Sequence, residues 1–296
     1  MSLWKNYLLV HSIPEALDAL ASKPRDARLV AGGTDLLLEL QQDLRPPVDT
    51  LIDVTSIPEL QALEIRGDHL FIGAGVSITR IVNSPLVQVH TPALAEACVL
   101  IGGPQVRNAA TLGGNVAHAL PAADGTIALL AFDAWAEAAS LVGTRCVQVL
   151  ELFLGPRRSD LEAKRELLIG FRLPLRQKGE GSAFRRVMRP QGVALPILNM
   201  AIWLRLNEEM IDDVRLAVGP AGPKPVRGFK AEEMLKGHRM DDNFIDRAYR
   251  KLLGEVRLRT SEYRATREYR RRLSRILLED CLKAAWERAS AYEIQM

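Results

Sequence analysis

The alternation of apolar and polar positions predicts short strands and short helices through the first half of the chain. Apolar residues at helical spacing favour a helix over 13–21, with Pro14 in its first turn. A second helix is expected over 93–100, and 126–130 and 134–139 continue as short mixed elements. Compact apolar runs predict strands at 28–30, 50–54 and 70–72. This succession indicates an α+β or α/β fold.

The composition turns polar and glycine-rich at 173–181, which predicts a domain boundary there. We therefore expect one domain over 1–175 and a second over 176–296. In the second domain, apolar runs favour strands, and helical periodicity runs almost throughout 242–292. The expected strands cover 193–206 and 214–218, followed by a proline-rich turn at 219–225.

Two glycine turns carry the chemistry of a phosphate site. The first, AGGTD at Ala31–Asp35, lies between a predicted strand and an apolar segment. Paired glycines let the backbone approach a ligand and point N–H groups at it, and Thr34 adds a hydroxyl. The second, TLGGN at Thr111–Asn115, repeats this pattern about 80 residues later. Together they favour a nucleotide-type cofactor held from two sides, although each read alone is also an ordinary turn.

Neither turn matches the dinucleotide fingerprint GxGxxG or the phosphate loop GxxxxGK[ST], which disfavours both of those nucleotide folds. Asp124 follows the second turn within PAADG. A carboxylate there can accept hydrogen bonds from ribose hydroxyls, and it is equally typical of a turn before Gly125.

Composition narrows the function classes. Hydrophobic residues form 48% of the chain and charged residues 25%, which is the range of ordinary globular proteins. The net charge is only +3 and aromatic residues form 5% of the chain, and both values argue against a nucleic-acid partner. Three scattered cysteines and five histidines lack metal-ligand spacing, so we expect no metal site. The chain shows no apolar run long enough for a membrane span and no basic-then-apolar leader, so a cytoplasmic location is expected.

The motifs in order resemble one family. AGGTDLL, LIDVTSIPEL, IGAGVSIT, GGPQVRNAATLGGNVAHALPAAD and ELLIGFRLP occur in the sequence found in the FAD-binding medium subunits of molybdenum hydroxylases, the xanthine dehydrogenase and aerobic carbon monoxide dehydrogenase type. The resemblance continues through VRLAVGPAGPKPVR, AEEMLKG and SEYR. It implies an α+β fold: an FAD domain of the vanillyl-alcohol-oxidase type, with subdomains at about 1–56 and 57–175, followed by a smaller C-terminal α+β domain.

The resemblance also implies a set of FAD-binding residues. Asp124 would bind ribityl or ribose hydroxyls, and Ile101 and Leu168 match positions that line the cofactor. Where many members carry Phe-Lys, with the lysine near the flavin, this chain has Phe184–Arg185. Arginine keeps the charge but is planar and bulkier, so Arg185 either stabilises a reduced flavin or forms a surface ion pair. The residues expected to wrap the diphosphate are Ala31, Gly32, Gly33, Thr34, Asp35, Leu36, Thr111, Gly113, Gly114 and Asn115.

An arginine-rich segment and one histidine are further candidates for a functional or structural role. Eight arginines lie within 256–276, and Tyr269, Leu273, Ile276 and Leu277 keep helical spacing, which predicts one buried helix face. The arginines themselves indicate either a solvated face or docking to an acidic partner. His118, four residues after Gly114, is the histidine nearest the predicted cofactor.

By resemblance, the chain is expected to pass electrons through FAD to NAD⁺ or another acceptor. Its partners would be a molybdopterin-binding large subunit and a [2Fe–2S] small subunit. No side chain of the chain itself is expected to act as a catalytic acid or base. Two alternatives remain: a stand-alone FAD-dependent oxidoreductase on the same fold, and a non-catalytic assembly protein.

Overall fold

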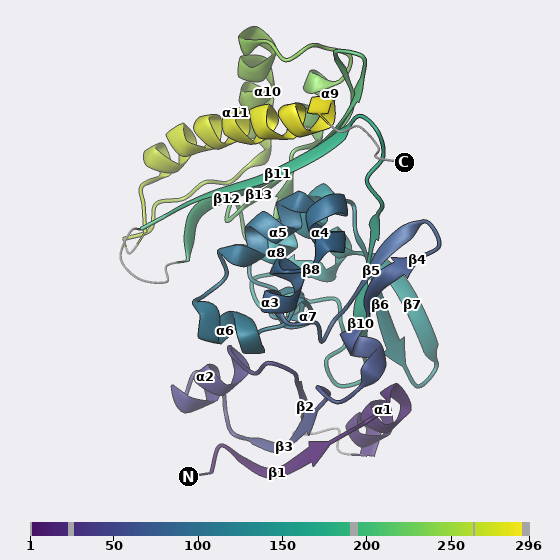
Figure 1. The fold of residues 1–296 in the computed structure, drawn as a ribbon. Coiled ribbons are helices and arrows are strands. Elements are labelled where there is room, and N and C mark those ends of the chain that lie inside the picture. Colours follow the sequence, from purple (N-terminus) through teal and green to yellow (C-terminus); the bar gives the residue numbers. More distant parts are fainter. Residues whose placement is uncertain (1, 23–26, 190–194, 263, 292–296) are drawn as a thin grey trace.

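The N-terminal subdomain is a three-stranded parallel sheet with one helix at each end (Figure 1). The computed structural model describes residues 2–22, 27–189, 195–262 and 264–291. Helix α1 (Ile13–Ser22) buries an apolar stripe of Ala16, Leu17, Ala19 and Leu20 against the sheet. Helix α2 (Leu36–Gln41) follows the first glycine turn. The strands are β1 (Trp4–Leu9), β2 (Ala27–Val30) and β3 (Val48–Asp53), in the order β1-β3-β2.

The second subdomain is a five-stranded antiparallel sheet covered by short helices. Its strand order is β4-β5-β10-β6-β7, from β4 (Leu63–Arg66), β5 (His69–Gly73), β6 (Trp135–Ser140), β7 (Gly143–Gln148) and β10 (Leu167–Pro174). The helices are α3 (Ile78–Val82), α4 (Pro85–His90), α5 (Pro92–Val99), α6 (Pro104–Ala109), α7 (Leu112–Ala117) and α8 (Asp124–Ala131). Every residue of α8 is buried, so this helix lies at the centre of the core.

Short elements complete this subdomain. They are the 3₁₀ helices Pro58–Gln61 and Val149–Leu152 and the small hairpin β8 (Phe153–Gly155) and β9 (Arg158–Ser159).

The C-terminal domain is a four-stranded antiparallel sheet with helices on one face. Its long helix α11 crosses β11 and β12 (Figure 1). The helix approaches so closely that a Cβ at Gly181 would lie 2.0 Å from the carbonyl oxygen of Ala285. The elements are β11 (Glu180–Met188), β12 (Pro196–Asn207), β13 (Met210–Gly219), β14 (Val226–Arg227), α9 (Phe229–Leu235), α10 (Asp242–Glu255) and α11 (Arg267–Ala291).

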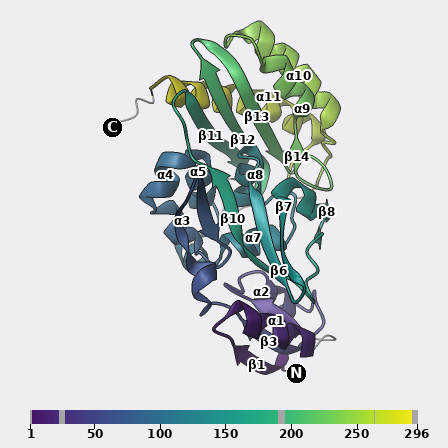
Figure 2. The same ribbon diagram turned by 90° about the vertical axis from the view of Figure 1, so that its right-hand side faces the viewer.

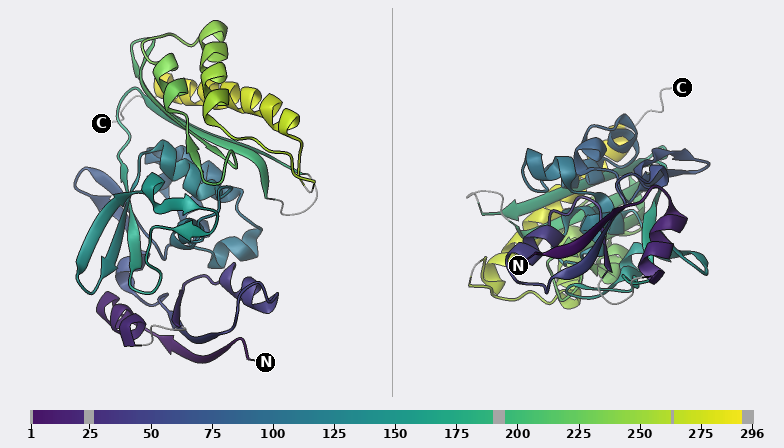
Figure 3. Two further views of the ribbon diagram at one scale, coloured as in Figure 1. Left: turned by 180° about the vertical axis from the view of Figure 1, so that it is seen from behind. Right: turned by 90° about the horizontal axis from the view of Figure 1, so that it is seen from below.

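The two faces of this C-terminal sheet belong to different cores. On β12, Met200 and Ile202 pack with the helices of the C-terminal domain. Ala201 and Trp203, on the opposite face, pack in the core that contains α5 and α8. Figures 2 and 3 show the resulting order, with the N-terminal subdomain, the second subdomain and the C-terminal domain stacked along the molecule. The C-terminal sheet therefore forms one wall of the core of the second subdomain.

Most of the predicted elements are confirmed. The expected helices over 13–21 and 93–100 correspond to α1 and α5, and the expected strands over 28–30, 70–72 and 214–218 lie within β2, β5 and β13. The expected strand over 50–54 corresponds to β3, which ends at Asp53. The expectation of helix almost throughout 242–292 holds for α10 and α11, and residues 256–262 and 264–266 between them are not helical. The predicted strand over 193–206 begins at Pro196 in the described residues, and 193 and 194 lie outside them.

The arginine-rich segment has only part of the buried face that was predicted for it. Leu273 and Leu277 are buried, whereas Tyr269 and Ile276 are 46% and 52% exposed. The prediction placed all four on one face, and it is wrong for these two because the sheet covers only a narrow stripe of α11. Arg270 is buried and donates to the carbonyl oxygen of Ile197, so at least one of the eight arginines has a structural role.

Among the described residues, no helix combines the length and the hydropathy that crossing a membrane requires.

Candidate functional site

The first glycine turn is pressed against the segment that leads into the second. A Cβ at Gly32 would lie 2.0 Å from the carbonyl oxygen of Ala109, so only glycine permits this approach. Gly33 has φ +65°, a conformation that other residues adopt at a cost. The structure therefore brings together the two turns, which stand about 80 residues apart in the sequence.

The second turn forms the start of α7. Thr111 caps this helix, and its Oγ1 accepts a hydrogen bond of 3.0 Å from the backbone N–H of Gly114. Gly113 is buried against Ala74, whose carbonyl oxygen would lie 2.6 Å from an added Cβ. Gly114 is different, because among the described residues an added Cβ would have one neighbour within 4 Å outside its own helix backbone, Thr111 Oγ1 at 3.2 Å. Gly113 serves packing, and Gly114 borders open space.

The first turn offers a row of available donors. Within the described residues, the backbone N–H groups of Gly32, Gly33, Thr34, Asp35 and Leu36 donate to no protein acceptor. Backbone N–H groups in partly buried segments are normally paired, so five consecutive ones indicate a site for an external acceptor. Phosphate oxygens match such a row of N–H groups, and the open side of Gly114 leaves room for them.

Asp124 lies deep between the two domains, at the first residue of α8, and is 4% exposed. Its Oδ1 accepts a hydrogen bond of 2.6 Å from Asn199 Nδ2 on β12, and Arg186 on β11 pairs with its Oδ2. Burial raises the pKa of Asp124 to about 6, although Arg186 and Asn199 both stabilise the ionised form. Asp124 therefore connects the second subdomain to the C-terminal sheet. Its contact with ribose or ribityl hydroxyls stays a prediction.

We expect Asp124→Asn to change how stability depends on pH. The folded protein holds the Asp124 proton up to about pH 6, whereas the unfolded chain releases it at about pH 4. The free energy of unfolding of the wild type therefore loses a contribution as the pH rises through this window. Asparagine has no such proton, so the stability of the variant minus that of the wild type rises between these values and is level above them. Urea denaturation from about pH 4 to about pH 8 measures the difference, and a pH-independent value would contradict the raised pKa.

Arg185 and Arg186 point to opposite sides of β11, because side chains alternate along a strand. Arg185 Nη1 lies 3.1 Å from Glu96 Oε1 on α5, and its side chain is 38% exposed. The side chain of Arg186 is 5% exposed and faces Asp124. The sequence analysis missed Arg186 and Asn199, and only recognition of β11 as a strand would have separated the two arginines. A role for Arg185 beside the flavin stays a prediction.

Ile101 and Leu168 both contact the core of the second subdomain. Ile101 precedes Gly102, and Arg107 Nη1 donates to the carbonyl oxygens of both, at 3.2 and 2.8 Å. Leu168 is 7% exposed on β10, where the pairing with β6 becomes irregular. Their position against the cofactor stays a prediction.

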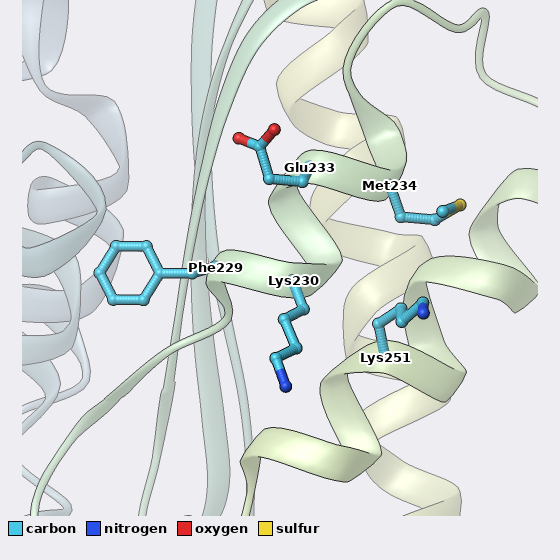
Figure 4. A pocket seen from close by; sticks show the side chains of 5 residues that line it. All are labelled: Phe229, Lys230, Glu233, Met234 and Lys251. Atoms are coloured by element: carbon cyan, nitrogen blue, oxygen red, sulfur yellow. The ribbon is translucent and has the colours of Figure 1, made fainter.

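A shallow pocket of 370 Å³ lies between α9 and α10 (Figure 4). These helices are at the end of the molecule opposite α2, which follows the first glycine turn (Figure 1). Figure 4 shows that its side chains diverge: Phe229 projects away from α10, Glu233 and Lys230 point in opposite directions, and Met234 and Lys251 lie between the helices. Polar groups that converge on one point are the mark of a small-molecule site. This pocket lacks that arrangement, so the glycine turns remain the candidate site.

Two family models match the chain. The FAD binding domain in molybdopterin dehydrogenase matches residues 4–176, and the CO dehydrogenase flavoprotein C-terminal domain matches residues 182–285. The putative xanthine dehydrogenase FAD-binding subunit of Escherichia coli is 30% identical over 95% of each chain. The nicotine 6-hydroxylase medium subunit of Paenarthrobacter nicotinovorans is 37% identical over 76% of this chain and 78% of its own.

Solved structures agree with these matches. Carbon monoxide dehydrogenase from Hydrogenophaga pseudoflava is similar with a TM-score of 0.91 and 29% identity, over 96% of this chain and 98% of that one. Quinoline 2-oxidoreductase from Pseudomonas putida 86 is similar with a TM-score of 0.88 and 26% identity, over 96% and 98%. The likeness confirms the predicted α+β fold.

Proposed function

The chain belongs to the family of FAD-binding subunits of the xanthine and CO dehydrogenase type, and on this premise we propose that it passes electrons from [2Fe–2S] clusters through FAD to NAD⁺ or another acceptor. FAD is the cofactor of the family, and the chain is an oxidoreductase subunit. A bound flavin supplies the redox chemistry, while the protein binds and orients it.

The two joined glycine turns support this proposal most directly. In our assignment, the diphosphate lies between the row of N–H groups from Gly32 to Leu36 and the open side of Gly114. A diphosphate carries negative charge and many acceptor oxygens, which fits donors that the protein leaves available. Ala31, Thr111, Gly113 and Asn115 complete the two turns.

The remaining predicted residues are assigned to the rest of the cofactor. Ile101 and Leu168 would line it, and Asp124 would bind its ribityl or ribose hydroxyls. A positive charge beside the flavin would come from Arg185 or Arg186. Arg185 suits that role better, because the ion pair with buried Asp124 already balances the charge of Arg186.

We propose that the partners are a molybdopterin-binding large subunit and a [2Fe–2S] small subunit, and that the assembly is cytoplasmic. The relatives support the partners, because their names describe medium chains and subunits of dehydrogenases. The organic substrate would then be oxidised on the large subunit, which leaves this chain only the electron transfer.

The test uses the complex that the tagged chain forms in its native host. We expect molybdenum, iron and FAD to co-purify in fixed ratio, and FAD to be identified by chromatography after release. The complex is then reduced anaerobically with stoichiometric dithionite, and reoxidation of its clusters by NAD⁺ or an artificial acceptor is followed by absorbance. Removal of FAD should stop this reoxidation, and added FAD should restore it. Isolation without iron and molybdenum would favour the stand-alone oxidoreductase, and failure to take up FAD would favour the assembly protein.

A further inference from the structure

A buried carboxylate lies just beyond the first glycine turn. Glu39 occupies α2, three residues after Leu36, and is 5% exposed. Glutamate is almost never this buried unless charged or polar partners surround it. Its burial therefore needs an explanation in terms of those partners.

The two carboxylate oxygens of Glu39 face different parts of the molecule. Oε2 accepts from Arg45 Nε at 3.1 Å, within the N-terminal subdomain. Oε1 lies 3.2 Å from Arg157 Nη2 and 3.7 Å from His118 Nε2, both of which belong to the second subdomain. Glu39 thus joins the two subdomains, and we call Glu39, His118 and Arg157 the Glu39 bridge.

The second-subdomain partners lie at the end of α7, the helix that begins in the second glycine turn. His118 is the C-cap residue of α7, and Ala119 follows it with φ +52°. The backbone N–H of Arg157 donates to the carbonyl oxygen of Ala119 at 3.0 Å, and Arg157 itself has φ +58°. A non-glycine residue in this conformation costs energy and persists where surrounding contacts impose it. Arg157 therefore holds the end of α7 through its backbone while its side chain reaches Glu39.

The Glu39 bridge lies at the α2 end of the N-terminal sheet, where the glycine turns are. At the α1 end, the two subdomains are joined by apolar packing, because Ala139 and Leu167 belong to the same core as α1 (Figure 1). At the α2 end, the two subdomains meet through the close approach of Gly32 to Ala109 and through the Glu39 bridge. The ionic link opposes a small rotation about the apolar contact that would separate the two glycine turns.

We propose that the Glu39 bridge sets the spacing between the two glycine turns and so fixes the opening that receives the FAD diphosphate. This inference rests on the proposed assignment of both turns to the diphosphate. In this proposal Glu39 is a positioning residue, because it acts on the turns through α2 and α7. The bridge acts before the cofactor arrives, so part of the ordering cost of binding is already met in the free chain.

The test compares FAD affinity in Glu39→Gln with that in a matched control, Glu166→Gln. Glu166 is also a largely buried glutamate, 10% exposed at its side chain, and Arg145 holds it within the second subdomain. Both substitutions keep the size of the side chain, remove its charge and lower the melting temperature. Only Glu39→Gln is expected to weaken FAD binding, by about tenfold, and to speed FAD release. Flavin fluorescence, measured well below both melting temperatures, gives the dissociation constant and the release rate.

A double-substitution cycle separates positioning from general loss of stability. Arg157→Met alone should weaken FAD binding by about the same factor, and Glu39→Gln combined with Arg157→Met should weaken it no further. Wild-type affinity in Glu39→Gln, an equal loss in Glu166→Gln, or additive effects in the double variant would each overturn the bridge. Gly114→Trp in the same assay tests the turns themselves. If that variant loses FAD while Glu39→Gln does not, the turns stand and only the bridge fails.

Discussion

Gly114→Trp is expected to weaken FAD binding severely while the chain stays folded. Among the described residues, an added Cβ at Gly114 meets Thr111 Oγ1 at 3.2 Å and no other atom of a neighbouring element within 4 Å, so a side chain there needs a small shift of that hydroxyl. The indole then occupies the open space beside the second turn, which we assign to the diphosphate. We expect the FAD dissociation constant to rise by about a hundredfold or more, equivalent to about 2.7 kcal/mol.

The matched control for this variant is Gly254→Trp. Gly254 also lies in a helix, and no atom lies within 4 Å of its added Cβ, but it belongs to α10 in the C-terminal domain. Fluorescence titration with FAD measures both affinities, and circular dichroism checks that both variants are folded. Normal FAD binding by folded Gly114→Trp would refute the assignment of the second turn. Gly113→Ala is unsuitable for this purpose, because its Cβ would overlap Ala74 and disturb the fold.

Arg186→Met is expected to cause the largest loss of stability. Arg186 and Asp124 form an ion pair in which both side chains are 5% exposed. Removing one member of such a pair leaves a buried charge without its counter-ion, at a cost of about 3–5 kcal/mol. The cost should be smaller at about pH 5.5 than at about pH 8, because burial raises the pKa of Asp124 and the neutral acid needs no counter-ion.

Arg185→Met is the matched control, one residue away on the same strand. Its partner Glu96 also pairs with Arg288, and the side chain of Arg185 is 38% exposed. We expect a loss of only about 0–1 kcal/mol, with little change between the two pH values. Urea denaturation measures both variants at each pH. Equal losses in the two variants, or a loss in Arg186→Met that does not grow with pH, would contradict this account.

Local sequence patterns predicted much of the fold because they reflect local physics. Apolar residues at helical spacing, together with Pro14, predicted helix α1. Compact apolar runs between turns predicted strands β2, β3 and β5. Two of the strands that were not predicted show why local patterns can fail. Strand β1 carries mostly exposed residues, and β11 begins with the polar and small residues of EGSA, so neither shows a clear apolar run. β1 joins its sheet by pairing with β3, and β11 joins its sheet by pairing with β12. The residues of β1 and β11 alone do not indicate these pairings.

Some features of the candidate site were likewise predictable from the sequence, and others were visible only in the structure. The sequence by itself determined the family, the cofactor and the two glycine turns, because glycine pairs and their flanking residues are contiguous motifs whose backbone chemistry is local. Only the tertiary structure decided that Gly32 lies against Ala109, that Arg186 faces Asp124, and that Glu39 reaches Arg157. These contacts join residues 62 or more positions apart. Long-range contacts follow from how whole elements pack, so the side-chain partners of a buried charge emerge only when the fold is complete.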